Sequence, residues 1–367
     1  MKASLSLTHN CNMACNYCYA GEKKRKDMKF DTGQKIVDFI LNITPQDQII
    51  EMNYFGGEPL LHFNLIKEIT QYIRTKEHSL KHPVTISITT NGTLLTSEIL
   101  EYFRKEKINV CISIDGDEKV HNINRCFKSG NGSFKEVVKK LELAVDTLDY
   151  VQVNAVYGPE TVNYLQETVA FLAERNVSAI HLNPNISADW KEDNFPTISG
   201  KFQQIADYYI NCFEKGKEIA VNYIDNKIII FLKGGYDKSD KCAMGEKEWG
   251  FAPSGNIYPC ERLIGNDEGT TFCLGNIYTG LNLEYQCSLI ETRDIVNIEC
   301  KDCKLQKYCM NWCGCTNYYM TGKTNLTGPF MCANESAAIE AAKRVLVTLK
   351  DNELFVNHFY QYLQRKC

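Results

Sequence analysis

The strongest constraint on the fold is a regular alternation of strand-like and helix-like patterns over the first half of the chain. Six short β-rich runs lie at residues 2–7, 49–55, 84–90, 108–114, 151–156 and 179–183, with longer helical patterns between them. Strands joined by crossover helices pair in parallel through right-handed connections. The pattern therefore predicts an α/β fold of six βα units, and periodicity alone leaves open a partial barrel or a doubly wound sheet.

Helical spacing of apolar residues places the helices, and a change of character marks a second domain. A helix is expected to begin after Ser133, a suitable N-cap, and others at residues 32–41, 198–217, 223–233 and 335–349. The alternation stops at Gly234-Gly235, and ten cysteines follow between Cys242 and Cys332. A segment in which apolar residues so rarely recur at helical or strand spacing is typical of a domain held together by metal. We expect a core at 1–233, a cysteine-rich domain at 234–335 and a C-terminal helical segment at 336–367.

Composition excludes several classes of partner. The 367 residues contain 41 Lys+Arg against 45 Asp+Glu, a net charge of −4 without a basic block, so a nucleic-acid partner is not expected. No apolar run approaches the length of a membrane span, and the first residues lack the apolar centre of a signal peptide. We therefore expect a cytoplasmic protein without membrane contact. Seventeen cysteines in a reducing compartment favour soft-metal or cluster ligation over disulfides.

The first group of cysteines follows the first predicted strand directly. Cys11, Cys15 and Cys18 form a CxxxCxxC loop at the carboxyl end of that strand, where α/β proteins carry their active sites. Three thiolates can bind three irons of a [4Fe–4S] cluster and leave the fourth iron open to a small molecule. The alternatives are a zinc site or structural cysteines, but zinc prefers CxxC pairs or Cys/His mixtures and no suitable His lies nearby.

This loop, with Tyr17 before its last cysteine, resembles that of the radical S-adenosylmethionine (SAM) enzymes. Gly56-Gly57-Glu58-Pro59, at the end of the second strand, resembles the glycine-rich SAM-binding motif of the same family. Glycines let the backbone approach a ligand, and a carboxylate can accept a hydrogen bond from its ammonium group. The resemblance implies a partial (β/α)6 TIM-like barrel as the core.

Further residues match the family in serial order along the chain. Thr89 ends the third strand, and Ser113 and Asp115 end the fourth, where the resemblance implies hydrogen bonds to the ribose and carboxylate of SAM. Arg125 resembles the carboxylate-binding arginine, a task for which a bidentate guanidinium is suited. Leu182 on the sixth strand resembles the apolar contact under adenine. Taken singly, each is better explained as a turn, cap, surface ion pair or core residue, and it is their serial order that favours the SAM site.

The resemblance also implies the chemistry. SAM chelates the open iron, one electron cleaves its sulfonium bond, and a 5′-deoxyadenosyl radical abstracts a substrate hydrogen, while the protein orients the reactants and excludes competing reactions. Such an enzyme needs a reducing partner, such as a flavodoxin or ferredoxin.

The cysteines beyond residue 240 resemble the SPASM domain of peptide- and protein-modifying radical SAM enzymes, which carries two auxiliary [4Fe–4S] clusters and brings the expected total to three. A zinc ribbon is the alternative. The ligands implied for the distal auxiliary cluster are Cys300, Cys303, Cys309 and Cys332. Those implied for the nearer auxiliary cluster are Cys242, Cys260 and Cys313.

The nearer cluster lacks an obvious fourth ligand, because no further cysteine lies between Cys242 and Cys260. Cys273 and Cys315 are candidates, and an open iron is the other possibility. Glu261 resembles an acidic residue that serves sulfatase-maturing enzymes as a base toward the substrate, and an exposed glutamate without a role is the alternative. The remaining cysteines are expected to be buried or surface thiols: Cys111, Cys126, Cys212, Cys287 and Cys367.

Three functions compete at this stage. The leading hypothesis is a maturase that forms a thioether in a ribosomally made precursor peptide (a RiPP), the second is an anaerobic sulfatase maturase that oxidises Cys or Ser to formylglycine, and the third is a metal-held binding module without catalysis. Ten residues precede Cys11, too few for an N-terminal winged-helix domain that grips a leader peptide. A leader would then be recognised by a separate protein, by the barrel and SPASM surfaces, or not at all.

Overall fold

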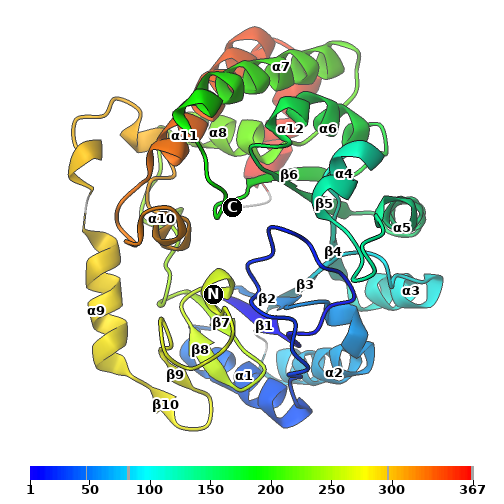
Figure 1. Ribbon diagram of the computed structural model, residues 1–367, viewed down its shortest axis with the longest axis vertical. Coiled ribbons are helices and arrows are strands. Elements are labelled where there is room, and N and C mark those ends of the chain that lie inside the picture. The colour runs from blue at the N-terminus through cyan, green and yellow to red at the C-terminus, as the bar shows by residue number, and fades with distance from the viewer. Residues whose placement is uncertain (47, 81–82, 296, 365–367) are drawn as a thin grey trace. The chain divides into compact units, whose positions relative to one another are not determined.

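The computed structural model of the chain (Figure 1) describes residues 1–46, 48–80, 83–295 and 297–364. These residues form two compact units that are each discontinuous in sequence. The first unit consists of Met1–Ser113, Asn122–Val151 and Cys242–Ile295, and the second of Ile114–His121, Gln152–Lys241 and Val296–Cys367. The three contiguous domains expected at 1–233, 234–335 and 336–367 are a different division of the chain and stay a prediction.

The first unit is built on a sheet in the order β10-β9-β8-β7-β1-β2-β3-β4. Its parallel strands are β7 (Glu248–Phe251), β1 (Lys2–Ser6), β2 (Ile50–Phe55), β3 (Val84–Thr90) and β4 (Ile108–Ser113). Its antiparallel extension is formed by β8 (Asn256–Tyr258), β9 (Gly275–Asn276) and β10 (Gly280–Leu281). The cysteine-rich segment thus continues the sheet that the first strand begins, which the sequence did not predict because strands this short leave no periodic signal.

Helices lie along the parallel strands of this unit (Figure 1). They are α1 (Phe30–Ile43), α2 (Phe63–Leu80), α3 (Ser97–Glu106) and α5 (Phe134–Thr147), with α9 (Leu283–Asp294) in the cysteine-rich part and 3-10 turns η1 (Pro59–His62) and η4 (Glu261–Leu263). Helix α1 buries Ile36, Val37 and Ile40 on one face. Ser133 precedes α5 as predicted, but its hydroxyl donates to the carbonyl oxygen of Arg125 at 2.9 Å and does not cap the helix.

The second unit contains the parallel pair β5 (Val151–Tyr157) and β6 (Ala179–Pro184). Its helices are α6 (Leu165–Ala173), α7 (Phe195–Glu214), α8 (Asn222–Lys233), α10 (Gly314–Thr321), α11 (Pro329–Leu349) and α12 (Glu353–Gln364), and α4 (Glu118–Asn124) begins in it. The 3-10 turns are η2 (Val162–Tyr164), η3 (Glu192–Asn194), η5 (Ile298–Cys300) and η6 (Gln306–Tyr308). Helix α11 packs against α7 and α8.

The six strands predicted from the sequence are all present, each within one residue at either end. Their parallel pairing within each unit confirms the α/β fold. Within the part of the chain that the structure describes, no helix is both long enough and apolar enough to cross a membrane.

Candidate active site

The CxxxCxxC loop leaves β1 at its carboxyl end and is fixed by backbone hydrogen bonds. The amide of Ala14 donates to the carbonyl oxygen of Cys126 at 2.8 Å, and the amide of Asn16 donates to that of Asn124 at 3.1 Å. Met13 forms an isolated bridge with Phe127. Residues 13–16 therefore lie along residues 124–127, in the stretch that contains the predicted SAM-binding arginine.

Arg125 contacts this loop through the aromatic ring of Tyr17. Its guanidinium carbon lies 5.3 Å from the ring centroid of Tyr17, a cation–π contact, and the residue is only 6% exposed. The carbonyl oxygen of Arg125 accepts bonds from the amide and hydroxyl of Ser133, at 3.3 and 2.9 Å. The structure thus brings together two residues that the sequence placed at one site from positions more than a hundred residues apart.

The three cysteines of the loop differ in environment. Cys11 is buried, Cys15 is half-buried and Cys18 is exposed. Burial raises the pKa of the Cys11 thiol, and the nearby Glu58 and Cys18 add to that effect. The ammonium group of Lys23 lies 2.8 Å from the Cys18 sulfur and donates a hydrogen bond to it.

This donor set suits an iron–sulfur cluster better than a single ion. Among the described residues, no three His, Cys, Asp or Glu side chains converge closely enough to hold one metal ion. A [4Fe–4S] cluster offers each thiolate its own iron, so its ligands stand apart around the cluster. Three sulfur donors on one short loop, two of them within electrostatic range of each other, fit that requirement.

The glycine motif after β2 packs against the cysteine loop. A Cβ atom on Gly57 would lie 2.1 Å from the carbonyl oxygen of Asn10, and one on Gly56, whose φ is +122°, would lie 2.5 Å from that of Thr8. The amide of Gly57 donates to Thr8 at 2.7 Å, and the amide of Glu58 donates to Asn10 at 2.9 Å. The close approach that requires glycine here is between two loops of the protein, whereas the sequence analysis assigned it to a ligand.

Glu58 joins a third loop to these two. Its carboxylate is fully buried and accepts hydrogen bonds from the amide of Leu60 at 3.0 Å, the hydroxyl of Thr90 at 2.7 Å and the amide of Asn91 at 2.8 Å. Burial raises the pKa of Glu58 to about 7, against the effect of these three donors. The observed partners give Glu58 a positioning role, and its expected contact with a ligand ammonium group stays a prediction. Pro59 begins η1 directly after it.

An amide network that the sequence analysis missed surrounds the Cys11 sulfur. Asn91 Nδ2 donates to Asn12 Oδ1 at 2.8 Å and lies 3.8 Å from Cys11 Sγ. The amide of Met13 also points to this sulfur, at 3.4 Å. Thr93 completes the network by donating to Asn91 Oδ1 and accepting from Asn12 Nδ2. Hydrogen bonds to ligand sulfurs are one of the means by which proteins tune cluster potentials.

The remaining predicted SAM contacts lie at strand ends. Thr89 is half-buried on β3, in register with Cys111 of β4, and Ser113 is the last, buried residue of β4. Burial raises the pKa of Cys111 to about 12, and the charge of Arg125 opposes that shift, so this thiol also lies near the arginine.

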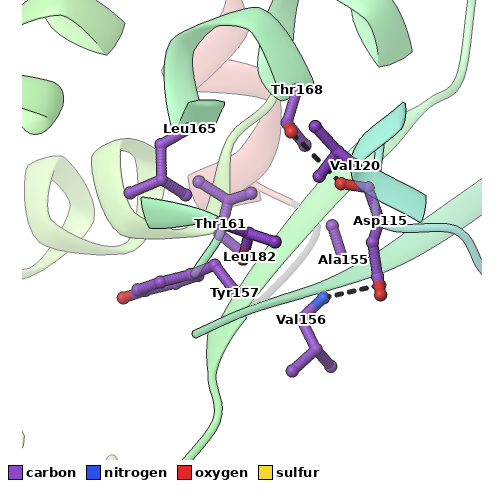
Figure 2. Close-up of a pocket in the computed structure, with 9 residues that line it drawn as sticks. All are labelled: Asp115, Val120, Ala155, Val156, Tyr157, Thr161, Leu165, Thr168 and Leu182. Carbon is purple, nitrogen blue, oxygen red and sulfur yellow. Dashed lines mark hydrogen bonds between the residues drawn. The ribbon is translucent and has the colours of Figure 1, made fainter. Parts of the chain in front are cut away.

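Asp115 and Leu182 belong to the second unit and line one small recess there (Figure 2). Figure 2 shows Asp115 bridging two elements: its carboxylate accepts from the amide of Val156 at 2.9 Å, and its carbonyl oxygen accepts from the hydroxyl of Thr168 at 3.1 Å. The recess holds about 200 Å³ of empty space, none of it wide enough for a water molecule. Both residues therefore lie in a packed wall, and their predicted contacts with SAM stay predictions.

The four cysteines assigned to the distal auxiliary cluster gather in the second unit. Burial raises the pKa of Cys309, and nearby Cys300 and Cys332 raise it further. Burial likewise raises the pKa of Cys332, with contributions from Cys303 and Cys300. Cys332 thus lies within electrostatic range of each of the other three thiols, although the chain between Cys300 and Cys332 spans more than thirty residues.

A buried ion pair, which sequence periodicity gave no reason to expect, holds the backbone on both sides of Cys309. Lys227 of α8 and Glu335 of α11 meet at 2.6 Å, and their side chains are 3% and 1% exposed. Lys227 Nζ also donates to the carbonyl oxygen of Tyr308 at 2.9 Å, and Glu335 accepts from the amide of Met310. The pair thus fixes both neighbours of Cys309 to two helices.

The cysteines considered for the nearer auxiliary cluster have various neighbours. In the first unit Cys260 is buried, its sulfur lies 3.5 Å from the carboxylate of the half-buried Glu261, and the Cys273 thiol donates to the carbonyl oxygen of Gly275 at 3.3 Å. In the second unit the sulfurs of Cys313 and Cys315 are 3.6 Å apart.

Of the five cysteines without an expected ligand role, Cys212 is buried, Cys111 and Cys126 are half-buried and Cys287 is exposed, while Cys367 lies outside the described residues.

A second buried carboxylate ties the loop after Cys18 to the cysteine-rich segment within the first unit. Asp267 accepts hydrogen bonds from Lys26 Nζ at 2.6 Å and from Ser254 Oγ and Asn256 Nδ2, both at 2.8 Å. Although burial opposes ionisation, these donors and His9 lower the pKa of Asp267 to about 2. The carboxylate is thus ionised, and it anchors the loop against strand β8 and its turn.

Known proteins match both the sequence and this arrangement. The profile of the Radical SAM superfamily matches residues 5–172, the part that carries the cysteine loop, the glycine motif and Arg125. An uncharacterized protein of Methanocaldococcus jannaschii is 35% identical over 286 residues, which are 74% of this chain and 87% of that protein. The chain belongs to the radical SAM superfamily. It is therefore an enzyme, and the family implies SAM and a [4Fe–4S] cluster at the CxxxCxxC loop.

More distant relatives include a radical SAM synthase and a sulfatase-maturating enzyme. The radical SAM cyclopropyl synthase TigE of Paramaledivibacter caminithermalis is 25% identical over 339 residues, 84% of this chain and 66% of TigE. The cysteine-type anaerobic sulfatase-maturating enzyme of Clostridium perfringens is 23% identical over 329 residues, 83% of this chain and 85% of that enzyme.

Solved structures show the same fold. The structure of anSMEcpe with bound AdoMet matches with a TM-score of 0.82 at 19% identity. The match covers 96% of this chain and 99% of the anSMEcpe chain. The structure of Streptococcus suis SuiB bound to precursor peptide SuiA has a TM-score of 0.63 at 17% identity, with 90% and 75% covered.

Proposed function

We propose that this radical SAM enzyme is a maturase that forms a thioether crosslink in a ribosomally made precursor peptide. The observation that carries the proposal is the second set of thiols: Cys300, Cys303, Cys309 and Cys332 gather in one unit of a chain that already has the CxxxCxxC loop. A thioether forms when a C–H and an S–H bond are lost, so two electrons leave the substrate. One leaves with the abstracted hydrogen atom, and an auxiliary cluster can accept the other.

The residues of the chain take the following parts in this proposal. The thiolates of Cys11, Cys15 and Cys18 hold the catalytic cluster, and SAM bound to it supplies the 5′-deoxyadenosyl radical. Arg125, already held over Tyr17, pairs with the SAM carboxylate. Glu58 keeps the glycine motif and the β3 loop together, so that the SAM-facing backbone is formed before SAM binds.

Thr89, Ser113, Asp115 and Leu182 complete the proposed SAM site at the strand ends. The nearer auxiliary cluster is held by Cys242, Cys260 and Cys313, with Glu261 as a base toward the substrate. We propose three [4Fe–4S] clusters in all, a flavodoxin or ferredoxin as reductant, and a cytoplasmic location, where thiols are kept reduced.

The peptide substrate is supported by what is known of similar proteins. SuiB, which shares this fold, has been solved with a precursor peptide, and the relative TigE is a radical SAM synthase. A leader peptide is recognised, in this proposal, by a separate protein or by the surfaces of the two units.

The second candidate, an anaerobic sulfatase maturase, is favoured by a different observation. The Clostridium perfringens sulfatase-maturating relative matches over 83% of this chain, and the anSMEcpe fold over 96%. Glu261, beside Cys260, is placed in sequence where such enzymes carry an acidic residue.

One experiment separates the two. The anaerobically reconstituted chain is incubated with SAM, a reductant and either the Cys-containing peptide encoded beside its gene or a sulfatase peptide with its modifiable Cys. A thioether maturase removes two hydrogen atoms from the first peptide. The cysteine sulfur is then bonded to carbon and no longer reacts with an alkylating reagent. A sulfatase maturase converts the second to an aldehyde that hydrazine traps. Absence of both products with intact SAM cleavage would refute peptide and protein maturation alike.

A further inference from the structure

A carboxylate lies beside the first cysteine of the nearer auxiliary cluster. Glu248 Oε2 is 3.0 Å from Cys242 Sγ, close enough for the thiol to donate a hydrogen bond. Glu248 is the first residue of β7, six positions after that cysteine. The sequence analysis sought the missing fourth ligand only among cysteines, and so did not consider it.

The backbone holds this pair together on a short turn. The amide of Glu248 donates to the carbonyl oxygen of Ala243 at 3.2 Å, and the amide of Gly245 donates to that of Glu248 at 3.2 Å. The turn then enters β7, which pairs in parallel with β1 and places Glu248 in register with Lys2. Glu248 is therefore held at the start of a paired strand, and the hydrogen-bonded turn at its N-terminal side begins at Ala243, directly after Cys242.

The carboxylate is also oriented. Lys2 Nζ lies 3.6 Å from Glu248 Oε1, so one oxygen faces a cation and the other faces the sulfur. The Glu248 side chain is 27% exposed, which leaves it room to turn by rotation about its own bonds.

The second predicted ligand, Cys260, follows strand β8 and directly precedes the turn η4. Gly245 donates to the carbonyl oxygen of Pro259 at 3.3 Å, and a Cβ on Gly250 would lie 2.8 Å from the carbonyl carbon of Cys260. The turn that carries Glu248 thus packs against the residues that carry Cys260. Of the alternative ligands in this unit, Cys273 already uses its thiol on the carbonyl oxygen of Gly275.

We propose that Glu248 is the fourth protein ligand of the nearer auxiliary cluster and binds its remaining iron through a carboxylate oxygen. The inference rests on the proposed function, because it takes Cys242, Cys260 and Cys313 as the other ligands. Cysteine binds iron as a thiolate, which has no hydrogen to donate, so the carboxylate needs a new partner once the cluster is bound. Carboxylates coordinate iron in other protein sites.

An oxygen ligand gives this cluster a replaceable position. Soft iron–sulfur sites prefer thiolate to carboxylate, so a cysteine of the bound peptide can displace Glu248. In that exchange the iron–oxygen bond breaks, an iron–sulfur bond forms and the thiol proton passes to water, with no change of oxidation state. In this proposal Glu248 would occupy the coordination position until the peptide binds, and the peptide sulfur would occupy it afterwards.

The test uses the full chain with the CxxxCxxC cysteines replaced by Ala, so that only auxiliary clusters contribute to the spectra. Mössbauer and EPR spectra of this parent are compared with those of Glu248→Ala, Glu248→Gln and Glu248→Cys versions. The matched control is Glu246→Ala, an exposed glutamate on the same turn that pairs with Arg293 at 3.3 Å. N-acetylcysteine serves as the thiolate probe.

In the parent, one iron of about eight should show an oxygen-ligated signal, eight being two clusters of four. Glu248→Ala and Glu248→Gln should lose that signal and Glu248→Cys should convert it to a thiolate-ligated one, while Glu246→Ala should match the parent. N-acetylcysteine should bind the Ala version at a lower concentration than the parent.

A Glu248→Ala spectrum identical to the parent, or a parent without the nearer cluster, overturns the assignment. The spectra require no peptide turnover, so failure to modify a peptide would count against the proposed function and leave the ligand assignment standing.

Discussion

The buried pair Lys227–Glu335 makes a prediction that joins stability to cluster assembly. Replacing Lys227 by Met removes the cation that pairs with Glu335 Oε2, so that this oxygen keeps the amide of Met310, and it leaves the carbonyl oxygen of Tyr308 without its lysine donor. The Glu335 carboxylate, 1% exposed, would then be a buried charge without a counter-ion. Both neighbours of Cys309 lose an anchor in the same step.

The magnitude follows from the burial of the pair. Removing one partner of a buried ion pair costs about 3–5 kcal/mol, because the other charge stays desolvated. For a unit of this size that cost corresponds to a fall of about 6–20 °C in the apparent Tm. Replacing both residues, as Lys227→Met with Glu335→Leu, removes both charges and should recover much of the stability, while the bonds to Tyr308 and Met310 stay lost.

The assay measures both consequences in one preparation. Thermal unfolding of the apo chain gives the stability, and iron and sulfide analysis after anaerobic reconstitution gives the cluster content. The double variant should be more stable than Lys227→Met alone, yet it should still hold about eight irons where the wild type holds about twelve, because the Cys309 loop is no longer fixed. A single variant with unchanged Tm, or a double variant with full iron and an unshifted distal-cluster potential, would refute the reasoning.

Three further predictions concern the catalytic part. Replacing all three cysteines of the CxxxCxxC loop by Ala should remove about one third of the iron and abolish SAM cleavage, and full cleavage would remove the cluster from that loop. Arg125→Lys, which keeps the charge but not the planar fork, should weaken SAM binding at constant iron content in equilibrium dialysis, and unaltered affinity would show that Arg125 does not pair with the SAM carboxylate. Burial raises the pKa of Glu58 from 4.5 to about 7. Between these two pH values the folded state holds a proton that the unfolded chain has lost. The stability contributed by this group is therefore fully present below pH 4.5 and is lost as the pH rises through 7. In Glu58→Gln, the free energy of opening measured by hydrogen exchange at the Asn91 amide should depend less on pH over this range. An unchanged pH dependence would show that another group titrates.

Much of the core was readable from the sequence, because the signals for it are local. Apolar periodicity located all six strands within a residue, and the covalent spacing of Cys11, Cys15 and Cys18 fixed three ligands on one loop whatever the rest of the chain does. The order of the motifs also placed Arg125 and Tyr17 at one site, which the ring contact between them supports. These inferences need only neighbouring residues and the rule that parallel strands end on the same side of a sheet.

The tertiary structure decided what depends on distant segments meeting. The motif Gly56-Gly57 reads as a ligand loop, but its tight contact is with the carbonyl oxygens of Thr8 and Asn10. Glu58 reads as a ligand contact, but its hydrogen bonds go to Leu60, Thr90 and Asn91. In both cases groups at another strand end fix the motif, namely Thr8 and Asn10 after β1 and Thr90 and Asn91 at the end of β3, and no local pattern encodes those contacts.

The same holds for the cysteine-rich part. Strand β7 joins the sheet beside β1, and only that pairing sets Glu248 against Lys2 while the turn before it sets the carboxylate against Cys242. Four residues of strand are too few for a periodic signal, and a glutamate is not recognised as a cluster ligand by spacing rules written for cysteines. The sequence by itself indicated which sulfurs are candidate iron ligands, whereas the tertiary structure decided which oxygen lies beside one of them.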